Sequence, residues 1–261
     1  MAEFCSLYSS SSGNCTYIGT SGGGILIDVG VSAKRTEDAL ISIGVDPSSI
    51  AGIFITHEHS DHISGVRVFA SRHNIDVYAS PGTLAGMDDY GVFKSKINAY
   101  VMPAQGVEAA GIYVRPFRTS HDSNESYGYT VVTPDGKRAA VATDTGIVTS
   151  EIVENLYGCD LALLESNHDI SMLKMGSYPY FLKERILSDR GHLSNDACAE
   201  LACRLFQGGT TRFILGHLSK ENNIPSLAYE TTKSALSLCG AEEGRDYLLT
   251  VAGDLNKPVK W

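Results

Sequence analysis

Short apolar runs, each bounded by glycine, serine or proline, follow one another along the whole chain. Runs of about four to eight apolar or β-branched residues between turn residues are typical of strands. We expect residues Ser9 to Asn14 to form a loop between the first two strands. The pattern predicts strands at 4–8, 15–18, 25–30, 51–56, 76–79, 100–102, 112–118, 127–133, 138–143, 161–164, 213–215 and 246–251.

Between these strands, apolar residues recur with the period of a helix. The clearest case is 32–43, where Ser32 is placed to cap the first turn and Gly44 to end the helix. The same pattern predicts helices at 63–72, 83–90, 150–157, 179–188, 195–206 and 225–238. Because the strands come in two blocks, each mixed with helices, we expect an α/β (α+β) fold with two mixed sheets packed face to face and helices outside. We expect one domain over residues 1–261.

Three histidines and an aspartate fall within one short segment, 57–62, which reads His-Glu-His-Ser-Asp-His and directly follows an apolar run. In an extended chain, residues two apart point to the same side, so His57, His59 and Asp61 can converge, and His62 joins them from the following turn. Imidazole nitrogen and carboxylate oxygen are ligands of zinc, manganese and iron. The segment therefore predicts a metal site rather than an ordinary polar turn. Glu58 should point the other way and have a structural role.

Composition narrows the class of protein only a little. Hydrophobic residues make up 43% and charged residues 20% of the 261 residues, as in ordinary globular proteins. The net charge of −9 disfavours a DNA coat protein, but an acidic enzyme can still act on nucleic acid through a local basic surface and its metals. We find no signal-peptide pattern and no apolar segment long enough to span a membrane, so we expect a cytoplasmic protein. The six cysteines form no Cys-x-x-Cys pair and are expected in the core.

Further polar residues lie just beyond the ends of predicted strands, where sheet-based folds gather their ligands. They are His121, Asp144, His168 and His217. His73, late on a polar helix face, has no such setting, and we expect it to be a surface histidine.

This arrangement resembles the metallo-β-lactamase superfamily, whose His-x-His-x-Asp-His motif is matched in full by residues 57–62. The resemblance implies a four-layer αββα sandwich of two mixed sheets, with two divalent metal ions at one edge. It implies a first metal held by His57, His59, His121 and Asp144. It implies a second metal held by Asp61, His62, Asp144 and His217. The ligand types suit zinc, manganese and iron alike.

The turn Gly191-His192, followed by a helix and then by Gly216-His217, is similar to the phosphodiesterase branch of that superfamily. In that branch the extra histidine gives a proton to the leaving oxygen, so His192 is the candidate general acid. The alternative is that His192 has only a structural role and hydrogen-bonds to the backbone near a helix cap. The segments 9–15, 165–169 and 178–195 are similar to the YycJ/WalJ group of bacterial proteins. That group is described as likely 5′-to-3′ DNA exonucleases, which implies DNA as the substrate.

The mechanism implied is attack on phosphorus by a hydroxide that bridges the two metals, with Asp61 orienting the water. His168 is a further candidate at the site, as a group that holds Glu165 or Asp169, a substrate contact or an extra ligand. Asn14 either lines the pocket or forms a tight turn.

Cations and aromatic side chains alternate in the segment before His192. Lys183 and Arg185 are candidate phosphate contacts beside aromatic residues that could stack bases. The alternative is an amphipathic helix with an aromatic core face and a solvated basic face.

Three functions compete. The first is the metal-dependent DNA exonuclease. The second is a small-molecule hydrolase of the same fold, acting on a cyclic phosphodiester or a thioester, which the acidity of the chain and the lack of room for a large inserted domain support. The third is a non-hydrolytic metalloprotein, either an iron redox protein or a binding module, against which the full set of seven ligands argues.

Overall fold

The computed structural model describes residues 2–253 and 258–260. By its internal contacts the chain divides into two compact units. The first comprises 1–116, 123–137 and 253–261, and the second comprises 117–122 and 138–252. The expectation of a single domain stays a prediction.

The first sheet belongs to the first unit and has the order β14-β1-β2-β3-β4-β5-β6. The strands β1, β2 and β3 form an antiparallel meander, and β3, β4, β5 and β6 run parallel to one another. Parallel neighbours end at the same edge of a sheet, which places the residues after β3 and β4 side by side. The bounds are β1 Glu3–Ser10, β2 Gly13–Thr20, β3 Gly23–Ile27, β4 Ile50–Phe54, β5 Val77–Ala79, β6 Ala99–Val101 and β14 Val259–Lys260.

The second sheet has the order β13-β12-β11-β10-β9-β8-β7. In the second unit, β10 to β13 are parallel, with Val141 paired to Leu163 and Leu163 to Ile214. Their carboxyl ends therefore also share one edge. The bounds are β7 Val107–Ala109, β8 Ile112–Arg118, β9 Tyr127–Val132, β10 Arg138–Ala142, β11 Leu161–Glu165, β12 Arg212–Gly216 and β13 Leu248–Val251.

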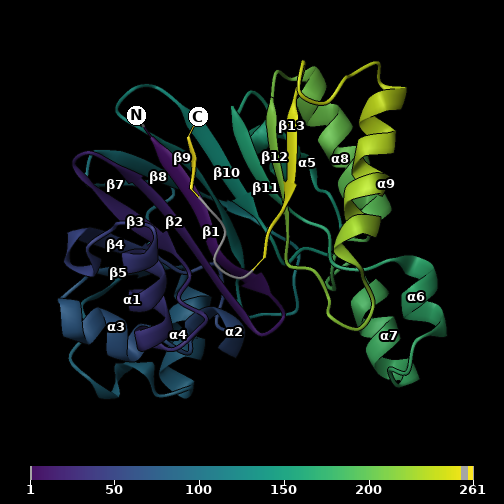
Figure 1. Ribbon diagram of the computed structural model, residues 1–261. Coiled ribbons are helices and arrows are strands. Elements are labelled where there is room, and N and C mark those ends of the chain that lie inside the picture. Colours follow the sequence, from purple (N-terminus) through teal and green to yellow (C-terminus); the bar gives the residue numbers. More distant parts are fainter. Residues whose placement is uncertain (1, 254–257, 261) are drawn as a thin grey trace. The chain divides into compact units, whose positions relative to one another are not determined.

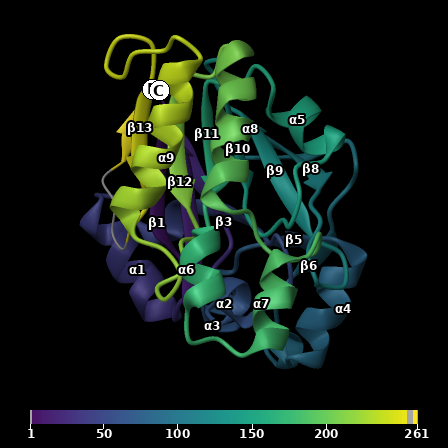
Figure 2. The same cartoon turned by 90° about the vertical axis from the view of Figure 1, so that its right-hand side faces the viewer.

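Helices cover one face of each group of strands. In the first unit these are α1 Ala33–Ser42, α2 Ser60–Ile63, α3 Val66–His73 and α4 Pro81–Asp89 (Figure 1), with short 3₁₀ turns at Pro47–Ser49 and Val92–Lys94. In the second unit they are α5 Ser150–Leu156, α6 Ile170–Met175, α7 Tyr180–Leu187, α8 Asn195–Gln207 and α9 Pro225–Leu238. Figure 2 shows α8 and α9 lying over β11 and β12. The expected fold class, two mixed sheets flanked by helices, is confirmed.

Each unit buries its own apolar core. In the first, Leu40 and Phe69 of the helices pack with Leu26 and Ile53 of the sheet. On the opposite face of that sheet, the ring of Phe54 lies 5.9 Å from that of Tyr129 on β9. In the second unit the helical side chains Leu201, Leu205 and Leu236 pack with Leu164, Phe213 and Leu215 of the strands. The framework that carries the strand ends is thus fixed by apolar packing.

Two expectations were wrong in detail. Residues Ser9 to Asn14 are not an open loop, because β1 and β2 continue to Ser10 and from Gly13, and only two residues form the turn. The reason is local bonding, since Ser10 N donates to Asn14 Oδ1 and Asn14 Nδ2 to Ser10 O. Not every cysteine is in the core, because Cys239 is exposed beyond the end of α9. All six thiols, which lie within the described residues, are free.

Candidate active site

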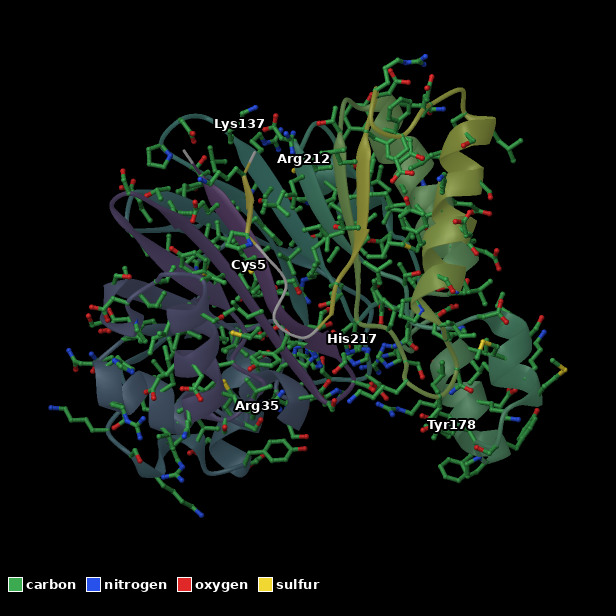
Figure 3. All side chains as sticks on the ribbon, in the orientation of Figure 1. Cys5, Arg35, Lys137, Tyr178, Arg212 and His217 are labelled. Carbon is green, nitrogen blue, oxygen red and sulfur yellow. The ribbon has the colours of Figure 1, made fainter. Side chains whose placement is uncertain are left out.

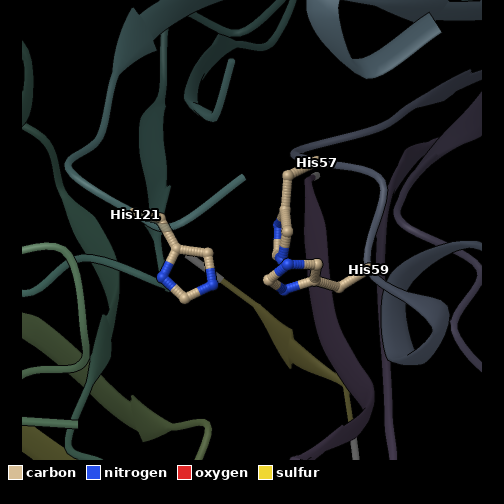
Figure 4. Close-up of side chains that lie close together, drawn as sticks. All are labelled: His57, His59 and His121. Carbon is tan, nitrogen blue, oxygen red and sulfur yellow. The ribbon is translucent and has the colours of Figure 1, made fainter. Parts of the chain in front are cut away.

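The segment after β4 carries the first group of candidate ligands, all within the first unit. The strand ends at Phe54, earlier than expected, and His57 and His59 lie in the loop that follows, with Asp61 and His62 on the short helix α2. The side chains converge through this turn rather than through strand alternation. The rings of His57 and His59 lie edge to face with centroids 4.6 Å apart (Figure 4), and those of His57 and His62 are 4.1 Å apart.

Asp28 orients His62 from the neighbouring strand end. This carboxylate follows β3 directly, is buried, and lies 2.8 Å from Nδ1 of His62 through Oδ2. Thr56 donates to the same carboxylate from its backbone nitrogen, over 2.8 Å, and from its hydroxyl, over 2.9 Å. With Nδ1 held by the carboxylate, Nε2 is the ring nitrogen that His62 presents as a ligand.

Asn14, on the β1–β2 hairpin, reaches the same group. Its Nδ2 lies 3.2 Å from Oδ2 of Asp61 and 3.0 Å from Nε2 of His62. The hairpin is held close, because Gly30 N donates to Asn14 O over 2.7 Å and a Cβ at Gly30 would lie 1.6 Å from Asp61 O. Asn14 therefore holds the side chain of Asp61, and its amide also donates to the Nε2 atom that His62 would offer to a metal.

The second unit gathers its candidate ligands beyond the ends of β10, β11 and β12. Asp144 and His217 have positive φ angles, 58° and 56°, as does Asp28 in the first unit at 61°. Non-glycine residues adopt this left-handed conformation rarely, and it is concentrated at functional sites. Oδ1 of Asp144 lies 3.5 Å from Nε2 of His217 (labelled in Figure 3) and 3.7 Å from Nε2 of His121.

Glu165, the last residue of β11, holds two of these rings. Its Oε1 lies 2.7 Å from Nδ1 of His192 and 3.0 Å from Nδ1 of His217. Its Oε2 accepts hydrogen bonds from the backbone nitrogens of Thr145, over 2.9 Å, and Leu193, over 3.3 Å. The carboxylate is fully buried, whereas the side chain of His192 is 15% exposed. His192 is thus held at Nδ1 and accessible to solvent.

His121 is anchored in the same way by a backbone group. Its Nδ1 donates to the carbonyl of Gly191 over 3.1 Å, which again leaves Nε2 on the side of Asp144. Arg190 Nε donates to the carbonyl of His121 over 3.1 Å. The ring centroids of His121 and His192 are 5.0 Å apart. The turn before His192 therefore supports His121 as well.

Burial shapes the ionisation of the site. Burial acts to raise the pKa of Glu165, but the charges and hydrogen bonds of His192 and His217 outweigh it and hold that pKa below its usual range. Burial raises the pKa of Asp28, against the opposing effect of His62. Burial lowers the pKa of His121, and it lowers the pKa of His168 to about 4.

The remaining candidates lie apart from these groups or are engaged elsewhere. His168 is buried beyond β11, and its Nδ1 has no hydrogen-bond partner among the described residues. Lys183 Nζ donates to the carbonyls of Lys174 and Gly176, over 2.8 and 2.7 Å. Arg185 makes a two-point ion pair with Asp122, Nη2 lying 3.0 Å from Oδ1.

Two residues outside the ligand set have structural contacts. Glu58 is buried and its Oε1 accepts a hydrogen bond from Asn124 N over 2.7 Å. His73 is half-buried rather than a plain surface histidine, because its ring lies beside that of Phe69 and its Nε2 is 2.9 Å from Glu37 Oε1. Sequence reasoning missed Asp28 and gave Glu165 no role of its own, although both are polar residues at strand ends.

The donor types of these groups fit a divalent metal. In the second unit, Asp144, Glu165, His192 and His217 each offer a ligand atom within 4.8 Å of the others. The rings of His62, His121 and His217 all have Nδ1 held by a buried carboxylate or a carbonyl, so all present Nε2. Such orienting contacts are expected of metal-ligating histidines. Imidazole and carboxylate without thiolate suit zinc, manganese and iron.

Comparison with known proteins agrees with this geometry. The model of the beta-lactamase superfamily domain matches residues 24–218. "Exodeoxyribonuclease WalJ" of Streptococcus pneumoniae is 37% identical over 94% of this chain and 92% of its own. "Exodeoxyribonuclease YycJ" of Bacillus anthracis is 34% identical over 94% of this chain and 93% of its own.

Among solved structures, zinc-bound PqqB from Methylobacterium extorquens is 16% identical and superposes with a TM-score of 0.74 over all of both chains, which shows the fold. Within the described residues, no helix is both long and apolar enough to cross a bilayer. The chain belongs to the metallo-β-lactamase branch of the β-lactamase superfamily.

Proposed function

We propose that this protein is a dinuclear-metal-dependent phosphodiesterase that removes nucleotides from DNA ends in the 5′-to-3′ direction. The observation that carries the proposal is His192, whose side chain is 15% exposed, held at Nδ1 by the buried Glu165 and with Nδ1 3.7 Å from Oδ1 of Asp144. A phosphodiester has a poor leaving oxygen, so its cleavage gains from a positioned proton donor. The names of the two relatives, which cover nearly the whole chain, support DNA as the substrate.

We assign the metal ligands from the motif and from the orientation of the rings. The first metal would have His57, His59, His121 and Asp144, and the second would have Asp61, His62, Asp144 and His217. Asp144 is suited to serve both, since its Oδ1 lies within 3.7 Å of Nε2 of both His121 and His217. When bound, two such metals lower the pKa of a water toward about 7 and neutralise charge on the phosphate oxygens.

The residues of the chain supply the rest of the chemistry. Asn14 holds Asp61 in the orientation in which its second oxygen can accept a proton from the attacking water. His192 gives a proton from Nε2 to the leaving oxygen, and the carboxylate of Glu165 offsets the charge of the doubly protonated ring. His168, whose pKa is lowered to about 4 by burial, stays neutral at neutral pH, and because its ring is buried we assign it a supporting role near Glu165 rather than proton transfer.

The cysteines support a place of action in the cytoplasm. All six thiols are free, and four of them are buried as small core residues. Free thiols of this kind are typical of a reducing compartment.

The experiment uses single-stranded and duplex DNA labelled at the 5′ or the 3′ end, with purified protein loaded with manganese, zinc or magnesium. We expect metal-dependent release of nucleotides from the 5′ end. The variants Asp61→Ala and His192→Ala should lose at least about 100-fold in rate. His73→Ala, a histidine outside the site, is the matched control.

Absence of release by the wild-type protein with every metal contradicts the proposal. Equal release by Asp61→Ala would also contradict it, because the activity would then come from a contaminant. If a cyclic phosphodiester or a thioester is hydrolysed much faster than DNA, the protein is a small-molecule hydrolase and the exonuclease proposal is wrong.

A further inference from the structure

The segment that leads into His192 carries large aromatic side chains in an exposed position. Residues 170–191, here called the arm, comprise α6, α7 and the turn to Gly191, and belong to the second unit. Both views show α6 and α7 beyond the ends of α8 and α9 (Figures 1 and 2). Tyr180 is 76% and Phe181 73% exposed, at the start of α7. Tyr178, just before them, is labelled in Figure 3.

These aromatic side chains are not what holds the arm in place. The helices α6 and α7 bury one side chain each, Leu173 and Ile186. Polar contacts do the rest, because Lys183 closes the end of α6 and Ser120 Oγ donates to the carbonyl of Asp189 over 2.7 Å. The alternative of an amphipathic helix with an aromatic core face is therefore wrong for Tyr180 and Phe181.

Two arginines of the arm contact the loop of the candidate active site that carries His121, within the same unit. Arg185 pairs with Asp122, the neighbour of His121, and Arg190 donates to the carbonyl of His121. Tyr180 lies five residues before Arg185, an axial rise of about 7.5 Å along α7. That rise corresponds to about two steps of stacked bases at roughly 3.4 Å each. The aromatic pair thus lies about two nucleotides along the helix from the contact that supports His121.

The charge of the arm favours an anionic partner. It has four cations, Lys174, Lys183, Arg185 and Arg190, against the two anions Glu184 and Asp189, a net charge of +2 that falls to +1 when Asp122, the partner of Arg185, is included. Since the whole chain carries −9, the remainder carries −11. A locally positive segment with exposed aromatic rings on an acidic protein suits a single nucleic-acid strand, whose backbone is negative and whose bases have flat apolar faces.

We propose that Tyr180 and Phe181 form a stacking surface for the unpaired bases of a single-stranded DNA segment next to the cleaved end. This inference rests on the proposed function and specifies how the same site recognises its substrate. The cations of the arm have a different role from the one that the sequence indicated. Lys183 and Arg185 hold the arm in shape and against the His121 loop, and the aromatic rings make the contact with DNA.

The test compares binding and cleavage in separate measurements. Binding is followed by fluorescence anisotropy with a labelled single-stranded oligonucleotide whose linkages are phosphorothioates, which slows cleavage. The same oligonucleotide with 2-aminopurine at successive positions reports stacking by quenching. The variants are Tyr180→Ala/Phe181→Ala, the aromatic replacement Tyr180→Trp/Phe181→Trp, and Tyr157→Ala. Tyr157, 53% exposed at the end of α5, is the matched control.

We expect the double alanine variant to bind at least about 5-fold more weakly, since the loss of one stacking contact alone predicts a fall of about 5- to 150-fold. Quenching should disappear at one or two adjacent positions, and the tryptophan variant should restore both signals. A dissociation constant within twofold of wild type would overturn the proposal. The proposal would also be overturned if the double alanine variant had half the mass of the wild-type protein in gel filtration and unchanged DNA binding. The two aromatic side chains would then join two copies of the chain.

Failure of the proposed function gives a different result. A wild-type protein that binds the oligonucleotide through Tyr180 and Phe181 but releases no nucleotide retains the stacking surface and refutes the exonuclease. A protein that releases nucleotides while the double alanine variant binds and cleaves like wild type keeps the exonuclease and refutes the stacking surface.

Discussion

Replacing Glu165 by glutamine changes one atom and tests how the site is built. All four hydrogen bonds of the carboxylate are accepted ones, two at Oε1 from His192 and His217 and two at Oε2 from the backbone of Thr145 and Leu193. The amide of glutamine has one acceptor and one donor. In either orientation its NH₂ group therefore faces two groups that are donors themselves. The substitution keeps the volume and removes about half of the bonding.

The expected loss of stability follows from those two bonds. A buried donor left without an acceptor costs about 1–3 kcal/mol, so Glu165→Gln should lower the free energy of unfolding by about 2–6 kcal/mol. That is a large part of the roughly 5–15 kcal/mol of an ordinary domain. With a urea dependence of about 3 kcal/mol per molar, the unfolding midpoint should fall by about 0.7–2 M. Glu37→Gln is the matched control, because its partly exposed ion pairs with Arg72 and His73 are worth at most about 1 kcal/mol.

The expected loss of activity has a diagnostic pattern. Without the carboxylate, His192 is no longer positioned, and DNA cleavage should fall by about 10²- to 10⁴-fold. A phosphodiester with a p-nitrophenolate leaving group needs no proton, so its hydrolysis should fall much less. The reasoning would be refuted if Glu165→Gln had the urea midpoint of the wild-type protein and cleaved both substrates at rates within a few-fold of the wild-type rates. An equal loss on both substrates would contradict the role of His192 as proton donor.

Further predictions concern the metals and the thiols. Asp28→Asn should weaken metal binding by about 10- to 100-fold, measured by competition with a chelating dye, because His62 loses its anchor; unchanged affinity would contradict that role. Removing metal with a chelator should lower the melting temperature by about 5–10 °C, the equivalent of about 2.7 kcal/mol for a metal at 100 times its dissociation constant, and zinc or manganese should restore it; a melting curve insensitive to metal speaks against the site. At pH 8, Ellman's reagent should react quickly with the exposed Cys239 and only after unfolding with Cys5 and Cys198, since burial raises the pKa of both buried thiols to about 12; rapid reaction of all the thiols in the native protein would disprove this.

The sequence predicted much of the framework because apolar periodicity and strand ends are local properties. The helix at 32–43 was expected with its Ser32 cap, and Ser32 Oγ accepts a hydrogen bond from Arg35 N. Asp144 and His217 were expected beyond strand ends, and they lie there, past β10 and β12. The helix α6 was missed because it has six residues and one buried side chain, Leu173, too few to show a period.

The rest depended on contacts between distant parts of the sequence. The local sequence around a cation on a helix is the same whether its side chain faces solvent, DNA or a carboxylate. The partner of Arg185, Asp122, is 63 residues away and could not be found from the sequence around Arg185. The hairpin at Ser9 to Asn14 was mistaken for a loop because serines favour turns, whereas the bond from Asn14 to Asp61 joins it to the site. Glu165 was left without a role because a glutamate at the end of a strand has no local pattern that reveals its two histidine partners, 27 and 52 residues away.

Those acceptors set four histidines of the site apart from His73 more sharply than their positions in the sequence do, whereas Nδ1 of His57 lies 3.1 Å from the hydroxyl of Thr56. The rings of His62, His121, His192 and His217 each have Nδ1 within 3.1 Å of a carboxylate or carbonyl oxygen, so each presents Nε2. His73 has the opposite arrangement, with Nε2 engaged by the surface carboxylate of Glu37. A metal or a substrate oxygen needs an imidazole nitrogen that is held in a fixed direction, and only a contact at the other nitrogen supplies that. The division of labour between ligand and proton donor then depends on exposure, because His217 is buried and His192 is open to solvent while both bond the same oxygen of Glu165.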